Sequence, residues 1–264
     1  MQNLIAITRE VSPAIARCEL THISRQAIDV EKARRQHLAY EQCLAGLGCT
    51  LVRLPADPRL PDSVFVEDTA VVLDEVALAA RPGARSRRAE TKSVAEALAA
   101  YRRVFHIHAP CTLDGGDVLV VGSRVFVGMS RRTNQAGLEE VRSLLTPLGY
   151  RVEGVPVVSA LHLKSAVTQV AERALLVNHN WTDTSAFAGA DSGFELIDVA
   201  PEEPFGANAL LIGETVVYPE AYPLTRRRLE DREITVVAVD ISELAKAEGG
   251  VTCSSLVFRA NHSD

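Results

Sequence analysis

A loose repeat of close to fifty residues limits what this chain can fold into more than any other feature of its sequence. In each copy a polar pair precedes an apolar strand, a turn and a second apolar strand follow, and then a helix begins. The second residues of the five polar pairs are Asp68, Asp117, Ser165, Asn208 and Ser254, at successive steps of 49, 48, 43 and 46 residues. A strand–strand–helix–strand unit cannot bury its apolar face alone, so the copies must pack against one another.

The spacing therefore predicts an α/β fold in which five units surround one axis, a five-fold pseudosymmetric α/β propeller. The fifth unit has to take its helix and outer strands from the other end of the chain, where residues 5–8 are typical of a strand and residues 31–48 of a helix. A chain of 264 residues can either split into domains or build one body from repeated units. Because the repeat favours the second option, we expect residues 1–264 to form a single domain. An ordinary mixed α/β sheet remains the alternative.

Two segments show clear helical periodicity. Residues 31–48 place a stripe on one face that consists of Ala33, His37, Tyr40, Leu44 and Leu47. Residues 134–148 repeat the pattern with Leu138, Val141, Leu144, Leu145 and Leu148. Gly149 is the expected C-terminal cap of this second helix. Short apolar strands are predicted after the helices, over residues 50–54, 104–107, 152–155 and 234–239.

Charge and composition exclude several classes of function. The net charge of -6 and the pI near 5.7 argue against a nucleic-acid groove or an anionic membrane surface, and they suit a cationic small molecule. The sequence has neither a secretory leader nor an apolar run long enough to span a bilayer, so we expect a cytoplasmic protein. Five cysteines without a Cys-x-x-Cys spacing indicate neither a disulfide framework nor a zinc ribbon.

Acidic side chains dominate the residues that the five-unit arrangement brings toward its axis. They are Asp62, Glu67, Asp68, Asp114 and Asp117, accompanied by His162 and Cys253. Neighbouring carboxylates repel one another and lose hydration unless a cation neutralises them. Zinc held by His162, Cys253 and Asp114 is one possibility, but the paired His or Cys spacing of zinc sites is missing, and we expect no metal and no cofactor. A guanidinium fits better, because it stays protonated and its N–H groups pair with carboxylates.

Cys253 is the candidate nucleophile for such a substrate. Resonance makes the guanidinium carbon a weak electrophile, so a thiolate has an advantage over water or a hydroxyl. A free thiol with a pKa of about 8.5 is mostly protonated at neutral pH, and a nearby His162 or a cationic substrate would favour the thiolate. His162 would protonate the departing amine and then activate water, with Asp114 orienting the imidazole.

Each of these residues also has a purely structural interpretation. His162 lies between Leu161 and Leu163 and can be a core residue. Residues 114–117 can form a turn held by side-chain hydrogen bonds, and Cys253 can be a buried strand residue behind the glycines at 249 and 250. From the residues alone, both interpretations stay open.

Several runs of sequence closely resemble the dimethylarginine dimethylaminohydrolases, or dimethylargininases, of the guanidine-modifying pentein-fold superfamily. These runs are DSVFVED at 62–68, RPGARSRR at 81–88, LDGGDVL at 113–119, RTNQ at 132–135, LHLKS at 161–165 and TCS at 252–254. Their order and spacing extend from about residue 60 to the carboxyl terminus, whereas the first sixty residues match only in general layout. The resemblance implies a five-unit propeller that hydrolyses Nω-methylated arginine to citrulline and methylamine or dimethylamine, with Cys253 and His162 as catalytic residues.

The resemblance also implies roles at the substrate. Glu67 and Asp68 would hold the guanidinium. Asp62, Arg87 and Arg132 would hold the amino-acid end, and the arginine forks suit a carboxylate. Backbone groups at Leu20, in a loop over the site, and at Ala247 would complete the pocket.

Three departures from the family pattern bear on these roles. Asp114 stands where certain bacterial relatives have glutamate, so it must approach His162 more closely. Glu248 stands where mammalian-type relatives have aspartate, which puts contacts at the substrate amino group in doubt. The segment from Trp181 to Ser192 has no confident counterpart.

The competing functions differ in their substrate, their product or the residues that they require. An arginine deiminase would act on unmethylated arginine, an amidinotransferase would pass the amidino group to an amine, and a binding protein on this fold would be expected to lose the catalytic residues. A cysteine protease is disfavoured because an acidic pocket repels the oxyanion of acyl transfer. We expect a small-molecule substrate as the only partner, and a monomer or homodimer.

Overall fold

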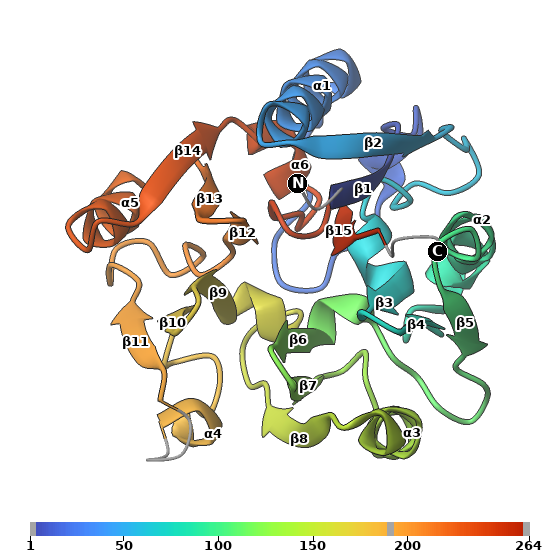
Figure 1. Ribbon diagram of the computed structural model, residues 1–264. Coiled ribbons are helices and arrows are strands. Elements are labelled where there is room, and N and C mark those ends of the chain that lie inside the picture. Colours follow the sequence, from blue (N-terminus) through green and yellow to red (C-terminus); the bar gives the residue numbers. More distant parts are fainter. Residues whose placement is uncertain (1–3, 189–192, 261–264) are drawn as a thin grey trace.

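The computed structural model describes residues 4–188 and 193–260, which form five three-stranded sheets around a central axis. Figure 1 views this ring along its axis, with α1, α2, α3 and α5 at the periphery. The predicted five-fold pseudosymmetric α/β propeller is therefore confirmed, and a single mixed sheet is not. None of the helices in the described part of the chain has the length and apolar character required to span a bilayer.

Four of the sheets follow one another along the chain. They comprise β3 (Ala70–Val72), β4 (Val76–Ala79) and β5 (Arg103–His106); β6 (Val118–Val121), β7 (Arg124–Met129) and β8 (Arg151–Pro156); β9 (Val167–Ala171), β10 (Ala174–Val177) and β11 (Glu195–Asp198); and β12 (Leu210–Ile212), β13 (Thr215–Pro219) and β14 (Thr235–Val239). In each sheet the first strand pairs antiparallel with the second, and the second pairs parallel with the third.

Parallel neighbours need a crossover connection, which explains the position of the helices. The connecting helices are α2 (Thr91–Leu98), α3 (Gln135–Leu145), α4 (Ser185–Ala188) and α5 (Pro223–Glu230). The third unit is atypical because its helix has only one turn. The sequence also does not predict its outer strand, β11. Residues 189–192 of the unmatched segment from Trp181 to Ser192 lie outside the described residues.

Both ends of the chain build the fifth sheet, as predicted. Strand β1 (Leu4–Arg9) lies between β15 (Leu256–Arg259) and β2 (Cys49–Leu54), with antiparallel pairing to β15 and parallel pairing to β2. Helix α1 (Val30–Gly46) connects β1 to β2, and the one-turn helix α6 (Ser242–Ala245) contacts α1. The ring is thus closed by hydrogen bonds between residues more than 240 positions apart in the sequence.

Local signals at the helix ends explain where the predicted bounds hold and where they shift. The Asp29 carboxylate accepts a hydrogen bond from the Lys32 N–H and caps α1, and Asn134 caps α3 in the same way through the Gly137 N–H. Helix α1 ends two residues earlier than predicted, because Gly48 adopts a φ of 91°. The second predicted helix continues past the end of α3 at Leu145 as a 3-10 turn, Thr146–Leu148, and Gly149, with a φ of 91°, caps that turn.

The apolar core consists of clusters that join neighbouring units. One cluster combines side chains of β3, β4, β6, β7 and α3 and includes Val71, Leu78, Val118, Val125 and Val141. Another combines β9 to β13 and includes Val170, Leu176, Ile197, Val216 and Tyr218. Each unit therefore depends on the next one to cover its apolar surface, as the repeat required.

The polar pairs that define the repeat lie in turns before the inner strands rather than in the strands. In the first three units these turns are short 3-10 helices at Val66–Thr69, Gly115–Asp117 and Leu163–Ser165. The first turn contacts the second, and the second contacts the third. Side chains from separate units therefore meet next to the axis.

Ring closure should depend measurably on Tyr40. Its buried hydroxyl donates to the Val251 carbonyl at 2.8 Å and lies 2.6 Å from the Ser255 hydroxyl, so it links α1 to the segment before β15. Tyr40→Phe leaves the Val251 carbonyl without this donor and should lower the free energy of unfolding by about 1–3 kcal/mol in urea denaturation. Tyr150→Phe removes a hydroxyl that bonds to exposed Glu75 and should cost less than about 0.5 kcal/mol. Equal losses in the two variants would contradict the role of Tyr40.

Candidate active site

Cys253 lies in the turn that leads into β15. The Gly250 N–H donates to its sulfur at 3.3 Å. A Cβ atom at Gly250 would lie 2.2 Å from the Asn208 side-chain oxygen, so only glycine allows this close approach. Asn208 in turn donates to the Lys164 carbonyl and to the Thr252 hydroxyl, and it accepts from the Thr252 N–H. The fourth unit therefore fixes the backbone that carries the thiol.

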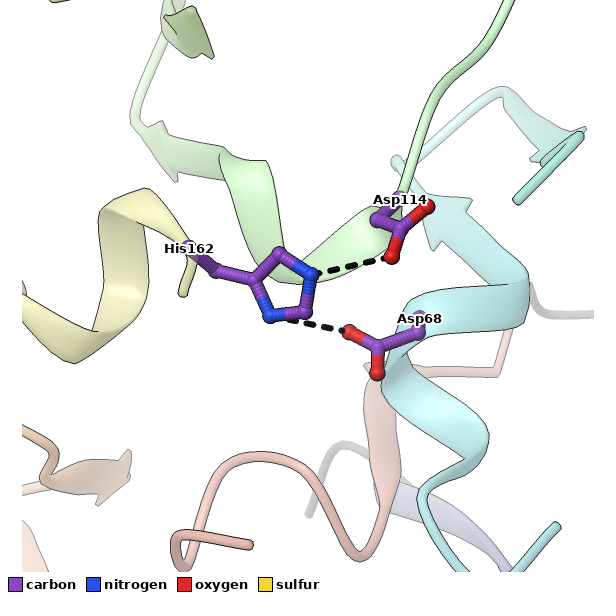
Figure 2. Close-up of side chains that lie close together, drawn as sticks. All are labelled: Asp68, Asp114 and His162. Carbon is purple, nitrogen blue, oxygen red and sulfur yellow. Dashed lines mark hydrogen bonds and ion pairs between the residues drawn. The ribbon is translucent and has the colours of Figure 1, made fainter. Parts of the chain in front are cut away.

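His162 lies between two carboxylates from other units (Figure 2). Its Nε2 is 2.9 Å from an Asp114 carboxylate oxygen, and its Nδ1 is 3.5 Å from an Asp68 carboxylate oxygen. Burial opposes the charge on the imidazole, but the charge of Asp68, the hydrogen bond to Asp114 and the charge of Asp117 outweigh burial and raise the pKa of His162 to about 9. At neutral pH the ring is therefore an imidazolium that can donate a proton.

The two glycines of the 114–117 motif make room for this cluster. A Cβ atom at Gly115 would lie 2.0 Å from the Glu67 carbonyl oxygen. At Gly116 it would lie 2.6 Å from an Asp68 carboxylate oxygen and 2.7 Å from His162 Nδ1. The motif is thus a turn, but one whose missing side chains let three units approach one another.

Asp117, which the repeat places near the axis, holds neighbouring segments in position through hydrogen bonds. One carboxylate oxygen accepts from the Ser130 and Thr133 hydroxyls at 2.6 Å each, and the other accepts from the Leu163 N–H at 3.0 Å. Burial raises its pKa to about 6. It ties the backbone next to His162 to the loop that carries Arg132.

Protein cations neutralise part of the acidic ring. Lys164 Nζ lies 2.6 Å from a Glu67 carboxylate oxygen, and the Thr252 hydroxyl donates to the other one at 2.7 Å. The Arg87 guanidinium forms ion pairs with both Asp68 and Glu90. Arg132 Nη1 lies 3.8 Å from an Asp114 carboxylate oxygen. The acids near the axis were expected to need an external cation, but side chains of the protein already neutralise part of their charge.

The zinc alternative does not fit the geometry of the described residues. The group whose ligand atoms lie within 4.8 Å of one another consists of Asp68, Asp114 and His162, and it does not include Cys253. Both nitrogens of the imidazole already face carboxylates, so the thiol is not part of the group around His162 that could bind a metal.

A small cavity of about 20 Å³ brings most of the predicted site residues together. Its lining includes Cys253, His162, Asp62, Asp68, Arg87, Arg132 and Ala247. Asp114 lies behind His162, and Glu67 faces a separate opening of about 1030 Å³ together with Lys164. Leu20 is not part of the lining of the small cavity, whereas its neighbour Glu19 is.

The thiol that faces this cavity is strongly disfavoured as an anion. Burial, followed by the negative charges of Glu67 and Asp68, raises the pKa of Cys253 to about 12. The protein without a ligand therefore combines a neutral thiol with a protonated His162. A cation placed beside the sulfur would lower the pKa of the thiol.

A loop from the amino-terminal part of the chain covers the cavity. The Glu248 carboxylate accepts hydrogen bonds from the backbone N–H groups of Thr21, His22 and Ile23. The Glu19 N–H donates to Asp62, and the Arg132 guanidinium donates to the Thr21 hydroxyl. Glu248, for which sequence reasoning left the contacts in doubt, thus holds this loop, here called the lid (residues 19–23).

The chain is similar to known proteins over most of its length. The family model described as N,N dimethylarginine dimethylhydrolase, eukaryotic, matches residues 16–258. A Streptomyces coelicolor N(G),N(G)-dimethylarginine dimethylaminohydrolase is 40% identical over 260 residues, 98% of each chain. The Pseudomonas aeruginosa protein of the same name is 35% identical over 232 residues, 87% of this chain and 90% of its own. A solved structure of the Pseudomonas enzyme, a cysteine-to-serine mutant complexed with citrulline, has a TM-score of 0.89 at 33% identity and covers 98% of this chain and 100% of its own.

Gly116→Ala should separate His162 from its carboxylates. The added methyl group cannot be accommodated at 2.6–2.7 Å from Asp68 and His162, so these side chains must move apart. Because the carboxylates raise the pKa of His162, we expect it to fall from about 9 toward the ordinary 6.5, as measured by NMR titration of the imidazole. Gly46→Ala, which meets nothing within 4 Å at the end of α1, is the control and should leave this pKa unchanged. An unaltered His162 pKa in Gly116→Ala would contradict the account.

Glu248→Ala should release the lid. Loss of a carboxylate that accepts three N–H groups should speed amide hydrogen exchange at Thr21, His22 and Ile23 by about tenfold or more. Glu202→Ala removes an exposed carboxylate from another loop and should leave exchange in the lid as it is. If the two variants show the same lid exchange as the parent protein, the lid is held by other contacts.

Proposed function

The chain belongs to the dimethylarginine dimethylaminohydrolase family, and from that premise we propose that Cys253 attacks the guanidinium carbon of Nω-methylated L-arginine. The protein is a hydrolase of guanidino C–N bonds, and its products are L-citrulline and methylamine or dimethylamine. The observation that carries the proposal is the shared cavity, where the half-buried thiol of Cys253, an imidazolium and the carboxylate of Asp68 meet.

Substrate binding activates the thiol in this mechanism. The guanidinium brings a positive charge next to Cys253 and offsets the negative charges that hold its pKa at about 12. The thiol then loses its proton to solvent, and the thiolate attacks the carbon. Because the charge of the substrate is required, a neutral analogue of the same shape would bind without ionising the sulfur.

His162 serves both halves of the reaction. In the first half, the S–C bond forms, the bond to the methylated nitrogen breaks, and His162 gives its proton to the departing amine. A cationic thiouronium remains on Cys253. In the second half, the now neutral His162 takes a proton from the attacking water, the C–S bond breaks as citrulline forms, and the second water proton returns to the sulfur. Side chains and water supply every step, so the scheme requires no cofactor.

The other assignments come from the family resemblance, and the positions of the side chains support them to different degrees. Asp114 orients His162, which the 2.9 Å contact supports. Glu67 and Asp68 hold the guanidinium, which would join their existing ion pairs with Lys164 and Arg87. Asp68 lines the small cavity, whereas Glu67 faces the separate opening and acts on Cys253 through its charge.

The amino-acid end of the substrate is assigned to Asp62, Arg87 and Arg132, all of which line the small cavity. Of the two arginines, Arg132 is the better candidate for the carboxylate, because its nearest protein carboxylate is Asp114 at 3.8 Å, whereas the Arg87 guanidinium donates hydrogen bonds to both Asp68 and Glu90. Backbone groups of Leu20 and Ala247 are the remaining assigned contacts.

Substrate access requires movement of the lid. A cavity of about 20 Å³ holds no more than a water molecule, so an arginine derivative cannot enter while the lid is closed. Opening the lid would expose Asp62 and Arg132, which both contact it. Closure over the bound substrate would then exclude bulk water from the first half of the reaction.

The setting of the protein is part of the same proposal. Residues 1–264 act as one catalytic domain, as a monomer or homodimer in the cytoplasm, with a small molecule as the only partner. The described cysteines, all of them free thiols, support a reducing compartment.

The function is tested by incubating the purified protein separately with asymmetric dimethylarginine, monomethylarginine and arginine. We expect citrulline together with dimethylamine or methylamine from the first two. Citrulline from arginine alone would identify an arginine deiminase instead. Cys253→Ser should lower kcat by at least about a thousandfold while the fold is retained, because loss of one member of a coupled nucleophile and acid/base pair costs several orders of magnitude.

A further inference from the structure

Cys253 borders a second cavity that the proposed mechanism does not use. This cavity, here called the side chamber, has a volume of about 230 Å³, and its apolar lining includes Ile23, Leu161, Trp181, Phe205, Tyr222 and Ile241. Leu161, Glu248 and Cys253 line both the side chamber and the small acidic cavity. The sulfur thus lies where a charged compartment meets an apolar one.

The two compartments differ in what they can hold. The acidic cavity of about 20 Å³ is closely filled by charged side chains, whereas the side chamber is more than ten times larger. An apolar cavity of about 150 Å³ in another protein is known to accept benzene, so the side chamber has room for a phenyl ring. Two methyl groups alone would leave most of it unused.

We propose that the side chamber receives the Nω-substituent of the substrate, and that the protein hydrolyses arginines whose substituent is a larger alkyl or a benzyl group. This inference rests on the proposed function, because it needs the leaving nitrogen beside Cys253 and His162. Leu161 precedes His162 in the chain and lies on the boundary of both cavities. A substituent on the leaving nitrogen would pass this boundary and enter the side chamber.

The outer wall of the chamber suits both the substituent and the released amine. Trp181 and Phe205 pack edge to face with ring centroids 4.9 Å apart, and the Phe205 side chain remains 50% exposed. Trp181 belongs to the segment for which the family resemblance gives no confident counterpart. Glu220 and Asp240 also line the chamber and would attract the amine after it becomes protonated in water.

The chemistry requires no new step. The S–C bond forms on Cys253, the bond from carbon to the substituted nitrogen breaks, and His162 protonates the departing alkylamine or benzylamine. Burial of each additional methylene in the chamber should raise kcat/KM about fourfold, as long as room remains. A substituent that found no room would lower kcat/KM by orders of magnitude instead.

The direct test is to measure citrulline and released amine with Nω-methyl-, Nω-propyl- and Nω-benzyl-L-arginine. We expect kcat/KM for the propyl and benzyl compounds to equal or exceed that for the methyl compound. Normal turnover of the methyl compound without release of benzylamine would overturn the inference and leave the proposed function intact. Absence of turnover with all three compounds would overturn both.

Two variants test whether the side chamber is responsible. Ala221→Trp fills it from its exposed rim and should lower kcat/KM for the benzyl compound more than tenfold, with the methyl compound changed less than about twofold. Phe205→Ala removes part of the aromatic wall and should affect the benzyl compound in the same selective way. Leu224→Ala is the matched control, since Leu224 is 49% exposed but does not line the chamber. Equal losses for the methyl and benzyl compounds in both chamber variants would contradict the proposal.

Discussion

The pairing of a buried imidazolium with carboxylates from two other units is the constraint on which the rest of the site depends. A charge removed from water is costly unless oppositely charged groups compensate it in a fixed geometry. His162, Asp68 and Asp114 come from three different units, so that geometry exists only when the ring is assembled. Three features hold these side chains in place. The glycines at 115 and 116 leave room for them, Asp117 fixes the backbone next to His162, and apolar clusters join the units. The propeller therefore brings together, from three units, the charged side chains to which we assign the chemistry.

Much of the fold could be read from the sequence, because the repeat and the helical stripes are local patterns. The ring of five sheets, the closure by both ends of the chain and the cap at Gly149 follow from such patterns. Pairings across units could not be read in this way. Nothing in the residue order indicates the ion pair of Lys164 with Glu67 or those of Arg87 with Asp68 and Glu90. The hydrogen bonds of Glu248 join it to backbone groups 225 to 227 positions away, so they too leave no local pattern. The atypical third unit escaped prediction as well, since a helix of one turn leaves no periodicity.

The raised pKa of Cys253 makes the thiol selective for cationic ligands over neutral electrophiles, independently of contacts with the rest of the ligand. A cysteine with a pKa of about 12 is nearly inert toward ordinary electrophiles at neutral pH. Burial and the charges of Glu67 and Asp68 disfavour the thiolate, and these are the two acids to which we assign the guanidinium. In the proposed mechanism, binding of the cationic substrate therefore also lowers the pKa of the thiol.

The antiparallel pairing of β15 with β1 has a consequence for how the protein comes into being. Strand β1 is made first and β15 nearly last, with the nucleophile only three residues before β15 begins. During translation one edge of β1 stays unpaired until β15, about 250 residues later, has left the ribosome. Such long-range closure is slow and exposes unpaired strand edges in the meantime. Cys253 therefore joins the other side chains that line the small cavity only after β15 has paired with β1.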